Sequence, residues 1–181
     1  MGNYHPIHDV WILARPKVKY FGAYPSGFLQ RARDLLGVGF DDPILHVCSG
    51  KIGEYPFRGL GPNDRTLDLD IDLDPDYLRD ARDPFPTCHL YARPPGWPGI
   101  LIDPPYSPGE AANYAPGSDA YPEPRTLLRN GLEAVRKGGK VGILHRHSPR
   151  PPKEGVRLVA IVGVFMGYEN DMRAFTVYER L

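Results

Sequence analysis

The stretch Ile100-Leu101-Ile102-Asp103-Pro104-Pro105-Tyr106 is expected to end a buried strand in a rigid turn, and the rest of the chain is organised around it. Three consecutive apolar residues are typical of a strand that is covered on both faces. The two prolines fix φ and remove two backbone donors, so the strand cannot continue. The turn therefore presents the Asp103 carboxylate beside the Tyr106 ring, a pair that suits a planar group carrying an amine. A strand-ending turn with a partly buried tyrosine is the structural alternative.

The composition is that of a single globular domain of 181 residues, 41% apolar and 24% charged. No apolar run approaches the roughly 18 residues that cross a bilayer, and the N-terminus lacks a signal-peptide pattern. Two cysteines, Cys48 and Cys88, are too few for a disulfide framework. We therefore expect one domain over residues 1–181, with 1–20 as an extension that the pattern does not define, in the cytoplasm and away from membranes.

The net charge is zero but unevenly distributed. Residues 51–124 carry 6 Lys/Arg against 13 Asp/Glu, whereas residues 125–181 carry 11 against 5. A neutral total argues against strong nonspecific binding of nucleic acid, which depends on neutralising phosphates. A basic face built from the last third of the chain remains open, as does a mixed solvated surface.

A helix and a strand with a glycine loop precede the turn. Apolar residues repeat at helical spacing from Phe28 to Leu36, with Ser26 as the expected N-cap and Gly37 as the C-cap. Residues 44–48 then form an expected buried strand that enters a loop containing Gly50. Such a loop lets the backbone approach a nucleotide-like cofactor closely. Because the spacing departs from G-x-G-x-x-G, an ordinary glycine turn remains the alternative.

Acidic residues follow this loop at a sequence separation that suits nucleotide binding. Asp68 lies 18 residues after Gly50, close to the separation at which a carboxylate meets a ribose diol in nucleotide-binding sheets. Residues 65–74 alternate leucine or isoleucine with aspartate and are expected to form a strand. A calcium loop is excluded because the required glycine and glutamate are absent. The later aspartates are expected to be solvated, and Asp80 supplies a second acidic point downstream.

The remaining pattern predicts an α/β fold whose sheet is mostly parallel, with an antiparallel C-terminal hairpin. Residues 107–124 are expected to form a polar loop, and residues 127–135 an amphipathic helix that ends at Gly138-Gly139. Strands are expected at 140–144, about 156–166 and 172–179, the last two joined by a turn near Glu169-Asn170. The Gly50 loop and the three aspartates would then follow strand ends and converge on one crevice.

These motifs resemble those of class I S-adenosylmethionine-dependent methyltransferases, specifically the Asp-Pro-Pro-Tyr amino-methyltransferases related to DNA adenine enzymes. The chain is also similar to a small bacterial and phage group in its Tyr-Pro-x-Gly-Phe, Ile-Leu-His-x-Cys-Ser-Gly, Asp-Ala-Arg and Ala-Phe-Thr-Val-Tyr-Glu segments. The resemblance covers residues 20–181. It implies a Rossmann-like sheet and S-adenosylmethionine as the cofactor.

The resemblance also implies residue roles. The methionine part of the cofactor would lie on the Ser49-Gly50 loop, its ribose on Asp68 and its adenine on Asp80. The target amine would be held by Asp103 and the Pro104 carbonyl. The implied cofactor-binding residues are Tyr24, Pro25, Gly27, Cys48, Ser49, Gly50, Asp68, Asp80, Ala81 and Asp103. The implied catalytic residues are Asp103, Pro104 and Tyr106. The implied substrate-binding residues are Pro105, Tyr106, Tyr114, Tyr121, His145, Arg146 and Arg150.

The acceptor is less sharply defined than the cofactor. The resemblance favours adenine N6 in DNA, which makes DNA the expected partner, and the basic residues Arg146, Arg150 and Lys153 are candidate phosphate contacts. RNA guanine, protein glutamine and a small molecule remain open as acceptors, and so does a non-catalytic binding subunit. The chain lacks a separate target-recognition region, which leaves a homodimer or a specificity partner open. No metal site is expected, because the histidines and cysteines lack metal-ligand spacing.

Overall fold

The computed structural model describes residues 4–16, 23–54, 59–88, 95–114, 121–167 and 172–181. Within these residues eight strands form one sheet in the order β1-β7-β8-β6-β5-β2-β3-β4. The strands are β1 Ile7–Leu13, β2 Ile44–Val47, β3 Arg65–Asp68, β4 Tyr77–Leu78, β5 Trp97–Ile102, β6 Val135–His145, β7 Val156–Met166 and β8 Met172–Arg180. The helices are α1 Phe28–Leu36, α2 Pro108–Tyr114 and α3 Pro124–Ala134. No helix in the described part of the chain is long and apolar enough to span a membrane.

The sheet is mixed, as the sequence predicts. β8 runs antiparallel to both of its neighbours, β6 and β7. The remaining strand pairs are parallel. From β2 the chain builds outward through β3 and β4, then returns to place β5 on the other side of β2. Ligands of such sheets bind outside the carboxyl ends of the strands at this switch point.

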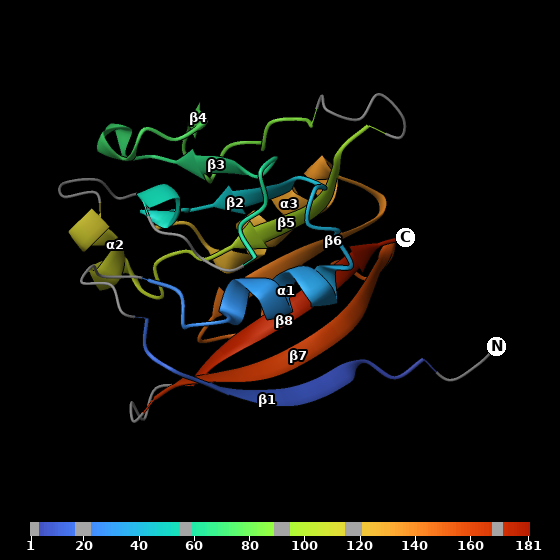
Figure 1. Cartoon of the computed structure of the whole chain (residues 1–181). Coiled ribbons are helices and arrows are strands. Elements are labelled where there is room, and N and C mark those ends of the chain that lie inside the picture. The colour runs from blue at the N-terminus through green and yellow to red at the C-terminus, as the bar shows by residue number, and fades with distance from the viewer. Residues whose placement is uncertain (1–3, 17–22, 55–58, 89–94, 115–120, 168–171) are drawn as a thin grey trace.

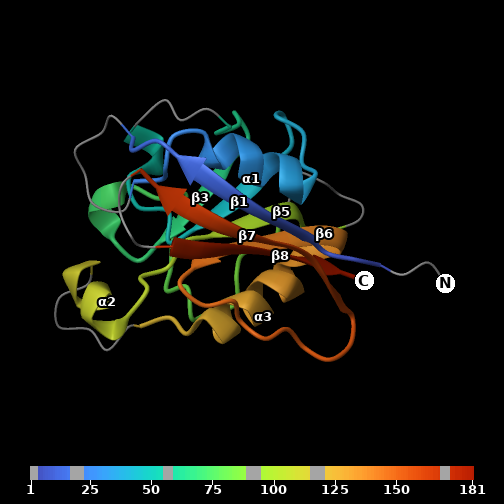
Figure 2. The same cartoon turned by 90° about the horizontal axis from the view of Figure 1, so that it is seen from below.

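Helices cover both faces of the sheet, α1 on one and α3 on the other (Figures 1 and 2). Two apolar clusters result. One joins α1 to β7 and β8 through Phe28, which stacks edge-on against Phe175 with ring centroids 5.1 Å apart. The other joins α3 to β5 and β6. All six residues of β5 are buried, because both of its faces are covered. The burial of one such side chain stabilises the fold by about 1.5–3 kcal/mol.

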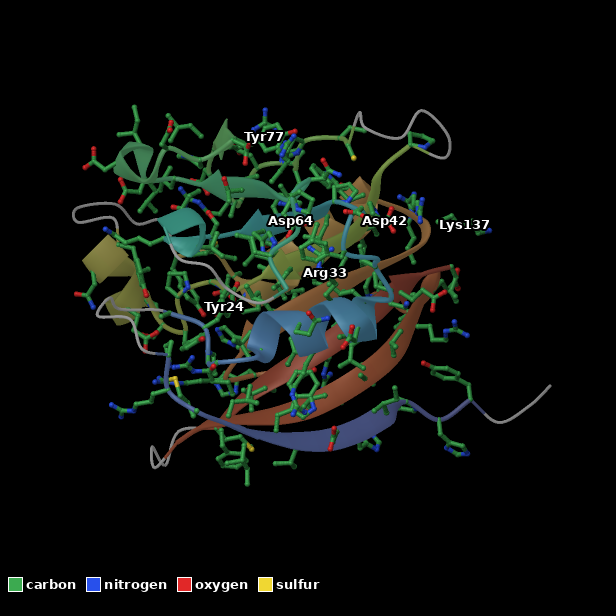
Figure 3. The ribbon with its side chains drawn as sticks, in the orientation of Figure 1. Tyr24, Arg33, Asp42, Asp64, Tyr77 and Lys137 are labelled. Carbon is green, nitrogen blue, oxygen red and sulfur yellow. The ribbon has the colours of Figure 1, made fainter. Side chains whose placement is uncertain are left out.

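A buried ionic cluster fixes the amino ends of β2 and β3 to α1. The Arg33 guanidinium of α1 donates to both oxygens of Asp64, at 2.6 Å for Oδ1, and to the carbonyls of Gly59 and Gly39. His46 Nε2 of β2 lies 3.1 Å from Asp64 Oδ2. Figure 3 shows Arg33 pointing from α1 toward Asp64, with Asp42 to one side. The cluster therefore orders the loop that leads into β3.

Several sequence expectations at element ends were wrong. Ser26 is not the N-cap of α1, because Gly27 occupies that position at φ 81° and no side chain caps the helix, whereas Gly37 is the C-cap as expected. The strand expected over residues 65–74 ends at Asp68. Beyond it Leu69 and Ile71 are 45% and 70% exposed, since the chain turns into a short 3₁₀ helix, Ile71–Leu73, and leaves the sheet.

The segments on either side of α3 also differ from expectation. Residues 107–124 are not a continuous loop, because α2 occupies Pro108–Tyr114. The helix expected to end at Gly138-Gly139 ends at Ala134, and β6 begins at the next residue. The two glycines lie in an irregularity of β6, where the register with β5 shifts between Trp97 and Gly99. A Cβ on Gly139 would lie 2.9 Å from the Trp97 carbonyl oxygen, so only glycine fits.

Two strands fall in regions that the sequence left undefined. β1 pairs in parallel with β7 and buries Trp11 and Leu13 against the α1 face. β4 is only the pair Tyr77–Leu78, beside β3. The expected turn near Glu169-Asn170 lies outside the described residues. Both additions extend the sheet at its edges and leave the switch point unchanged.

Candidate active site

The Asp-Pro-Pro-Tyr turn lies at the carboxyl end of β5 and is tied to β2 and to its own tyrosine. The Asp103 N–H donates to the Val47 carbonyl at 3.2 Å, which aligns the turn with the end of β2. The Tyr106 hydroxyl donates to Asp103 Oδ1 at 2.9 Å. Pro104 is buried, while Asp103 and Pro105 are half-buried. The carboxylate and the aromatic ring therefore form one hydrogen-bonded unit.

Helix α2 holds the tyrosine from the other side. Ser107 begins the helix by accepting from the Glu110 N–H at its hydroxyl, 3.1 Å, and from the Ala111 N–H at its carbonyl, 2.9 Å. Glu110 Oε2 then accepts from the Tyr106 N–H at 2.9 Å. In Figure 1 α2 lies at the end of the sheet to which the arrows of β2 and β3 point. The helix that the sequence missed thus fastens the turn.

The loop after β2 turns sharply and is closed by Asp68. Cys48 and Gly50 both have positive φ, 54° and 51°. Asp68 Oδ2 accepts from the Gly50 N–H at 2.9 Å, while Oδ1 accepts from the backbone N–H groups of Leu69 and Asp70 at 2.8 and 3.1 Å. Ser49, between the two turning residues, is buried. The aspartate expected to meet a ribose therefore lies against the glycine loop, as its spacing predicted.

The loop after β4 is fixed by an asparagine on α3. Asn130 is buried, and its Nδ2 lies 3.3, 3.1 and 2.9 Å from the carbonyls of Ala81, Arg82 and Asp83. Within the loop, Arg82 donates to the Asp80 carboxylate with its shortest contact at 2.6 Å, and this hydrogen bond lowers the pKa of Asp80. Asp80 is therefore an ionised group at a fixed position.

The three aspartates converge, as the sequence predicts. Burial raises the pKa of the Cys48 thiol well above its usual value, and the charges of Asp68, Asp103 and Asp80 raise it further. These carboxylates come from the ends of three different strands, so each must lie near the end of β2 to act on one thiol. The arrangement gathers three carboxyl groups around the carboxyl end of β2.

The carboxyl group of Asp103 titrates near neutral pH. Burial raises its pKa to about 7, against the charge of Arg173 and the hydrogen bond from Tyr106, which both lower it, while Glu110 raises it. The Tyr106 hydroxyl has its pKa raised well above the usual value, first by burial and then by the charge of Asp103. The Tyr106 hydroxyl therefore keeps its proton over the pH range in which Asp103 ionises, and it can donate that proton to the carboxylate.

Two guanidinium groups and a histidine surround the Tyr106 ring. The Cζ atoms of Arg173 and Arg146 lie 5.1 and 5.7 Å from the ring centroid. The His145 ring meets it edge-on at 5.5 Å between centroids. Arg146 also pairs with Glu110 at 3.3 Å. The aromatic surface expected to stack on an acceptor is thus bordered by positive charge.

His145 is held as a neutral ring. Its Nδ1 accepts from the His147 N–H at 3.0 Å, which places the proton on Nε2, 3.5 Å from the Tyr121 hydroxyl. Burial lowers the pKa of His145. His145 and Arg146 therefore lie against the Tyr106 ring and Tyr121 lies next to His145, while the substrate-binding role expected of all three stays a prediction.

Other expected residues have weaker ties to this unit. The hydroxyl pKa of Tyr114, at the end of α2, is raised by burial and then by Asp103, which places the ring near the turn. Tyr24 stacks on Phe28 at 5.1 Å, and Pro25 accepts from the Phe28 N–H at 3.0 Å. Figure 3 shows Tyr24 at the end of α1 that faces α2. Within the described part of the chain, neither Arg150 nor Lys153 forms a hydrogen bond or an ion pair with the turn.

The sequence did not identify Glu110, Asn130 or Arg173. Glu110 carried a usable signal, since a serine followed three residues later by a glutamate is the pattern of a helix start. Asn130 and Arg173 carried none, because one polar residue within a helix or strand is ordinarily a surface residue.

The fold is similar to that of solved methyltransferases. TrmN from Thermus thermophilus superposes with a TM-score of 0.58 at 21% identity over 89% of this chain, which spans only 50% of TrmN. The N-methyltransferase NodS from Bradyrhizobium japonicum WM9, in complex with S-adenosyl-l-homocysteine, superposes with a TM-score of 0.51 at 16% identity over 83% of this chain and 84% of NodS. No protein-family model matches the sequence, and no curated protein matches it. The structural likenesses confirm the expected Rossmann-like sheet.

Proposed function

We propose that this protein is an Asp-Pro-Pro-Tyr amino-methyltransferase that transfers a methyl group from S-adenosylmethionine to the exocyclic amine of a base, with adenine N6 in DNA as the first acceptor to test. The observation that carries the proposal is the hydrogen-bonded pair of Asp103 and Tyr106 at the switch point. This pair shares the end of β2 with the loop closed by Asp68. Cofactor and acceptor sites would then adjoin, as group transfer requires.

The residues around the glycine loop fit S-adenosylmethionine. A Cβ built on Gly50 meets nothing within 4 Å, so the backbone there is open to a ligand. A carboxylate oxygen can accept two hydrogen bonds, and among the described residues Asp68 Oδ2 accepts one, from the Gly50 N–H. Asp68 can therefore accept from a ribose hydroxyl while it keeps the loop closed. Bound there, the cofactor would supply an electrophilic methyl group.

Asp103 and Pro104 would prepare the acceptor nitrogen. The lone pair of an exocyclic amine is conjugated with its ring and is a poor nucleophile. Two acceptors, the Asp103 carboxylate and the Pro104 carbonyl, would bind the two N–H groups and turn the lone pair toward the methyl group. The rate gain would come from this orientation and from electrostatic alignment. The ionised carboxylate would be the stronger acceptor of the two forms of Asp103.

Tyr106 would hold the base against the turn. Base stacking on an aromatic side chain contributes about 1–3 kcal/mol per base. The guanidinium groups of Arg173 and Arg146 beside the ring would face the phosphate of a nucleotide whose base lies there. Their presence favours nucleic acid over a neutral small molecule. The likeness to NodS, an N-methyltransferase, supports nitrogen as the acceptor atom.

The test is transfer of labelled methyl from S-adenosylmethionine to separate pools of DNA, RNA and protein. We expect label in DNA from the wild type and none from Asp103→Ala. The matched control is Asp72→Asn, an exposed aspartate on the segment between β3 and β4, which should keep full transfer. Label in RNA alone would move the acceptor to RNA, and label in protein alone would overturn the nucleic-acid proposal. If calorimetry shows no binding of the cofactor at millimolar concentration, the protein is a non-catalytic subunit.

A further inference from the structure

Two strands carry an arginine each to the Tyr106 ring, at the carboxyl end of the sheet. Arg146 and Arg173 stand one residue beyond the last pair of the β6–β8 ladder. Their Cζ atoms lie 5.7 and 5.1 Å from the ring centroid. The pairing continues across the sheet, since Arg173 pairs with Val164 of β7 and Val164 pairs with Trp11 of β1. These strands therefore bring the two arginines and Trp11 to one level of the sheet.

Two further arginines extend this level beyond the hairpin. Trp11 and Val164 are buried against α1, and Arg173 shares their face because paired residues of neighbouring strands point the same way. The exposed Arg31 of α1 lies over Trp11, with its Cζ 5.5 Å from the indole centroid. Arg15 follows the end of β1 by two residues and is also exposed. We call this set the arginine row: Arg15, Arg31, Arg146 and Arg173.

The arginine row is long enough to meet several nucleotides. It runs from β6 to β1 across β8 and β7, which is three strand spacings. At about 4.8 Å per spacing the row covers about 14 Å. A strand of B-form DNA advances about 3.4 Å per nucleotide, so the row matches about four phosphates. Figure 2 shows the arrows of β1 and β7 pointing to the side on which α2 lies, so the row and the turn before α2 share one end of the sheet.

The other half of this end of the sheet is acidic. Beyond β5 the sheet continues with β2, β3 and β4, and residues 68–83 carry seven aspartates against two arginines. Among the described residues, Glu110 pairs with Arg146 at 3.3 Å and Asp9 accepts from the Trp11 indole N–H at 2.8 Å, which leaves the row an excess of positive charge. A polyanion at the turn after β5 would be attracted to the arginine row and repelled by the acidic half.

We propose that the arginine row binds the phosphodiester backbone of a nucleic acid, so that the strand leaves the Tyr106 ring over β8, β7 and β1. A guanidinium group forms charge-assisted hydrogen bonds with phosphate oxygens, and such contacts fix the position of a strand without reading its sequence. The choice of nucleic acid as the partner rests on the proposed function, whereas the position of the arginines does not. Arg15 and Arg31 decide the matter, because they lie beside β1 and Trp11 while the other two border the Tyr106 ring.

The first experiment measures the binding of fluorescent single-stranded DNA, and of RNA of the same sequence, to the full chain by anisotropy at increasing KCl concentration. Each lost phosphate contact to a single strand reduces the slope of log K against log salt by about 0.7. We expect Arg15→Gln/Arg31→Gln to reduce the slope by about 1.4 and the affinity at about 0.1 M salt by about 25-fold. Arg31→Lys should bind like the wild type, because lysine keeps the charge.

Two exposed arginines away from the row serve as matched controls. Arg79→Gln removes a cation from the acidic half, and Arg129→Gln removes one from α3, and both should keep the wild-type slope. The unfolding midpoint in urea should be unchanged in each variant. If loss of Arg31 shifts that midpoint, Arg15→Gln alone carries the test, with an expected reduction of about 0.7 in the slope.

Three results would overturn the inference. The first is a wild-type slope in the folded double variant. The second is a reduction in Arg79→Gln as large as that in the double variant, since the strand would then run over the acidic half. The third is a wild type that binds neither DNA nor RNA.

The second experiment measures the steady-state kinetics of methyl transfer to the nucleic acid that binds. We expect Arg15→Gln/Arg31→Gln to raise KM by about the factor lost in binding and to keep kcat, because these arginines lie away from the reacting atoms. A fall in kcat at constant KM overturns the backbone role. A wild type that binds DNA through the arginine row but transfers no methyl group overturns the proposed function alone. A wild type that transfers methyl groups, with a double variant that binds as tightly as Arg129→Gln, overturns the role of the arginine row alone.

Discussion

Asp64 and Asp103, two shielded carboxylates of the described part of the chain, lie in opposite electrostatic environments. Asp64 receives donors from Arg33, His46 and the Ile44 and Gly61 N–H groups, and together they outweigh burial and lower its pKa. Asp103 accepts from the Tyr106 hydroxyl, and burial raises its pKa to about 7. Asp64 lies at the amino end of β2 and Asp103 at the carboxyl end of β5. A carboxylate saturated with donors holds the fold, whereas one with acceptor capacity left is suited to a ligand.

The largest expected effect on stability comes from Asp64→Asn. The side chain is 3% exposed, and its loss of charge leaves the buried Arg33 guanidinium uncompensated. Breaking a buried ion pair on one side costs about 3–5 kcal/mol. We therefore expect the free energy of unfolding, measured by urea denaturation, to fall by about that amount. Asp72→Asn, at an exposed position of the 3₁₀ helix after β3, should change it by less than about 0.5 kcal/mol. An equal loss in both variants would show that Asp64 contributes no more to stability than an exposed aspartate does.

Asp103→Asn should have the opposite effect: it should abolish methyl transfer without lowering the free energy of unfolding. Losing one preorganised electrostatic contact at a reacting group typically costs about 10²–10³ in rate. Asparagine keeps an acceptor for the Tyr106 hydroxyl and removes a charge that burial disfavours. We expect labelled methyl transfer to fall by at least about 100-fold while the unfolding midpoint in urea stays level or rises. A variant that unfolds more easily than the wild type would show that Asp103 is structural.

The two carboxylates should also respond to pH with opposite signs. The folded pKa of Asp103 lies above its ordinary value of 3.8, so the folded state binds the extra proton and stability falls as pH rises from about 4 to about 7. The free energy of unfolding of Asp103→Asn should therefore exceed that of the wild type by an amount that grows over this pH window and then levels off. The folded pKa of Asp64 lies below 3.8, so its contribution is present above that pH and is lost in acid. Urea denaturation of the wild type and the two variants at pH 2.5, 4, 5.5 and 8 measures both slopes, and slopes of the same sign would contradict the assignment.

The parts that the sequence predicted are those in which local pattern and tertiary structure agree. The apolar runs that became β2, β5, β7 and β8 are long or continuous enough to be recognised alone. α2 was missed because its seven residues bury only Ala111 and offer no helical period. The convergence of Asp68, Asp80 and Asp103 followed from strand ends in a parallel sheet. The position of Arg173 beside the Tyr106 ring could not be predicted in this way, because it depends on where the antiparallel hairpin lies across the sheet.

The smallest expected effect tests the start of α1. The sequence predicts Ser26 as the N-cap, but Gly27 occupies that position and no side chain caps the helix. Ser26 is exposed, and its N–H donates to the Ala14 carbonyl at 2.9 Å, a bond that alanine retains. Loss of a true serine cap costs about 1 kcal/mol, whereas an ordinary surface substitution stays within about 0.5 kcal/mol. Ser26→Ala should therefore leave the free energy of unfolding within about 0.5 kcal/mol of the wild type. A loss near 1 kcal/mol would restore Ser26 as the cap, and α1 would then start one residue earlier than its left-handed glycine indicates.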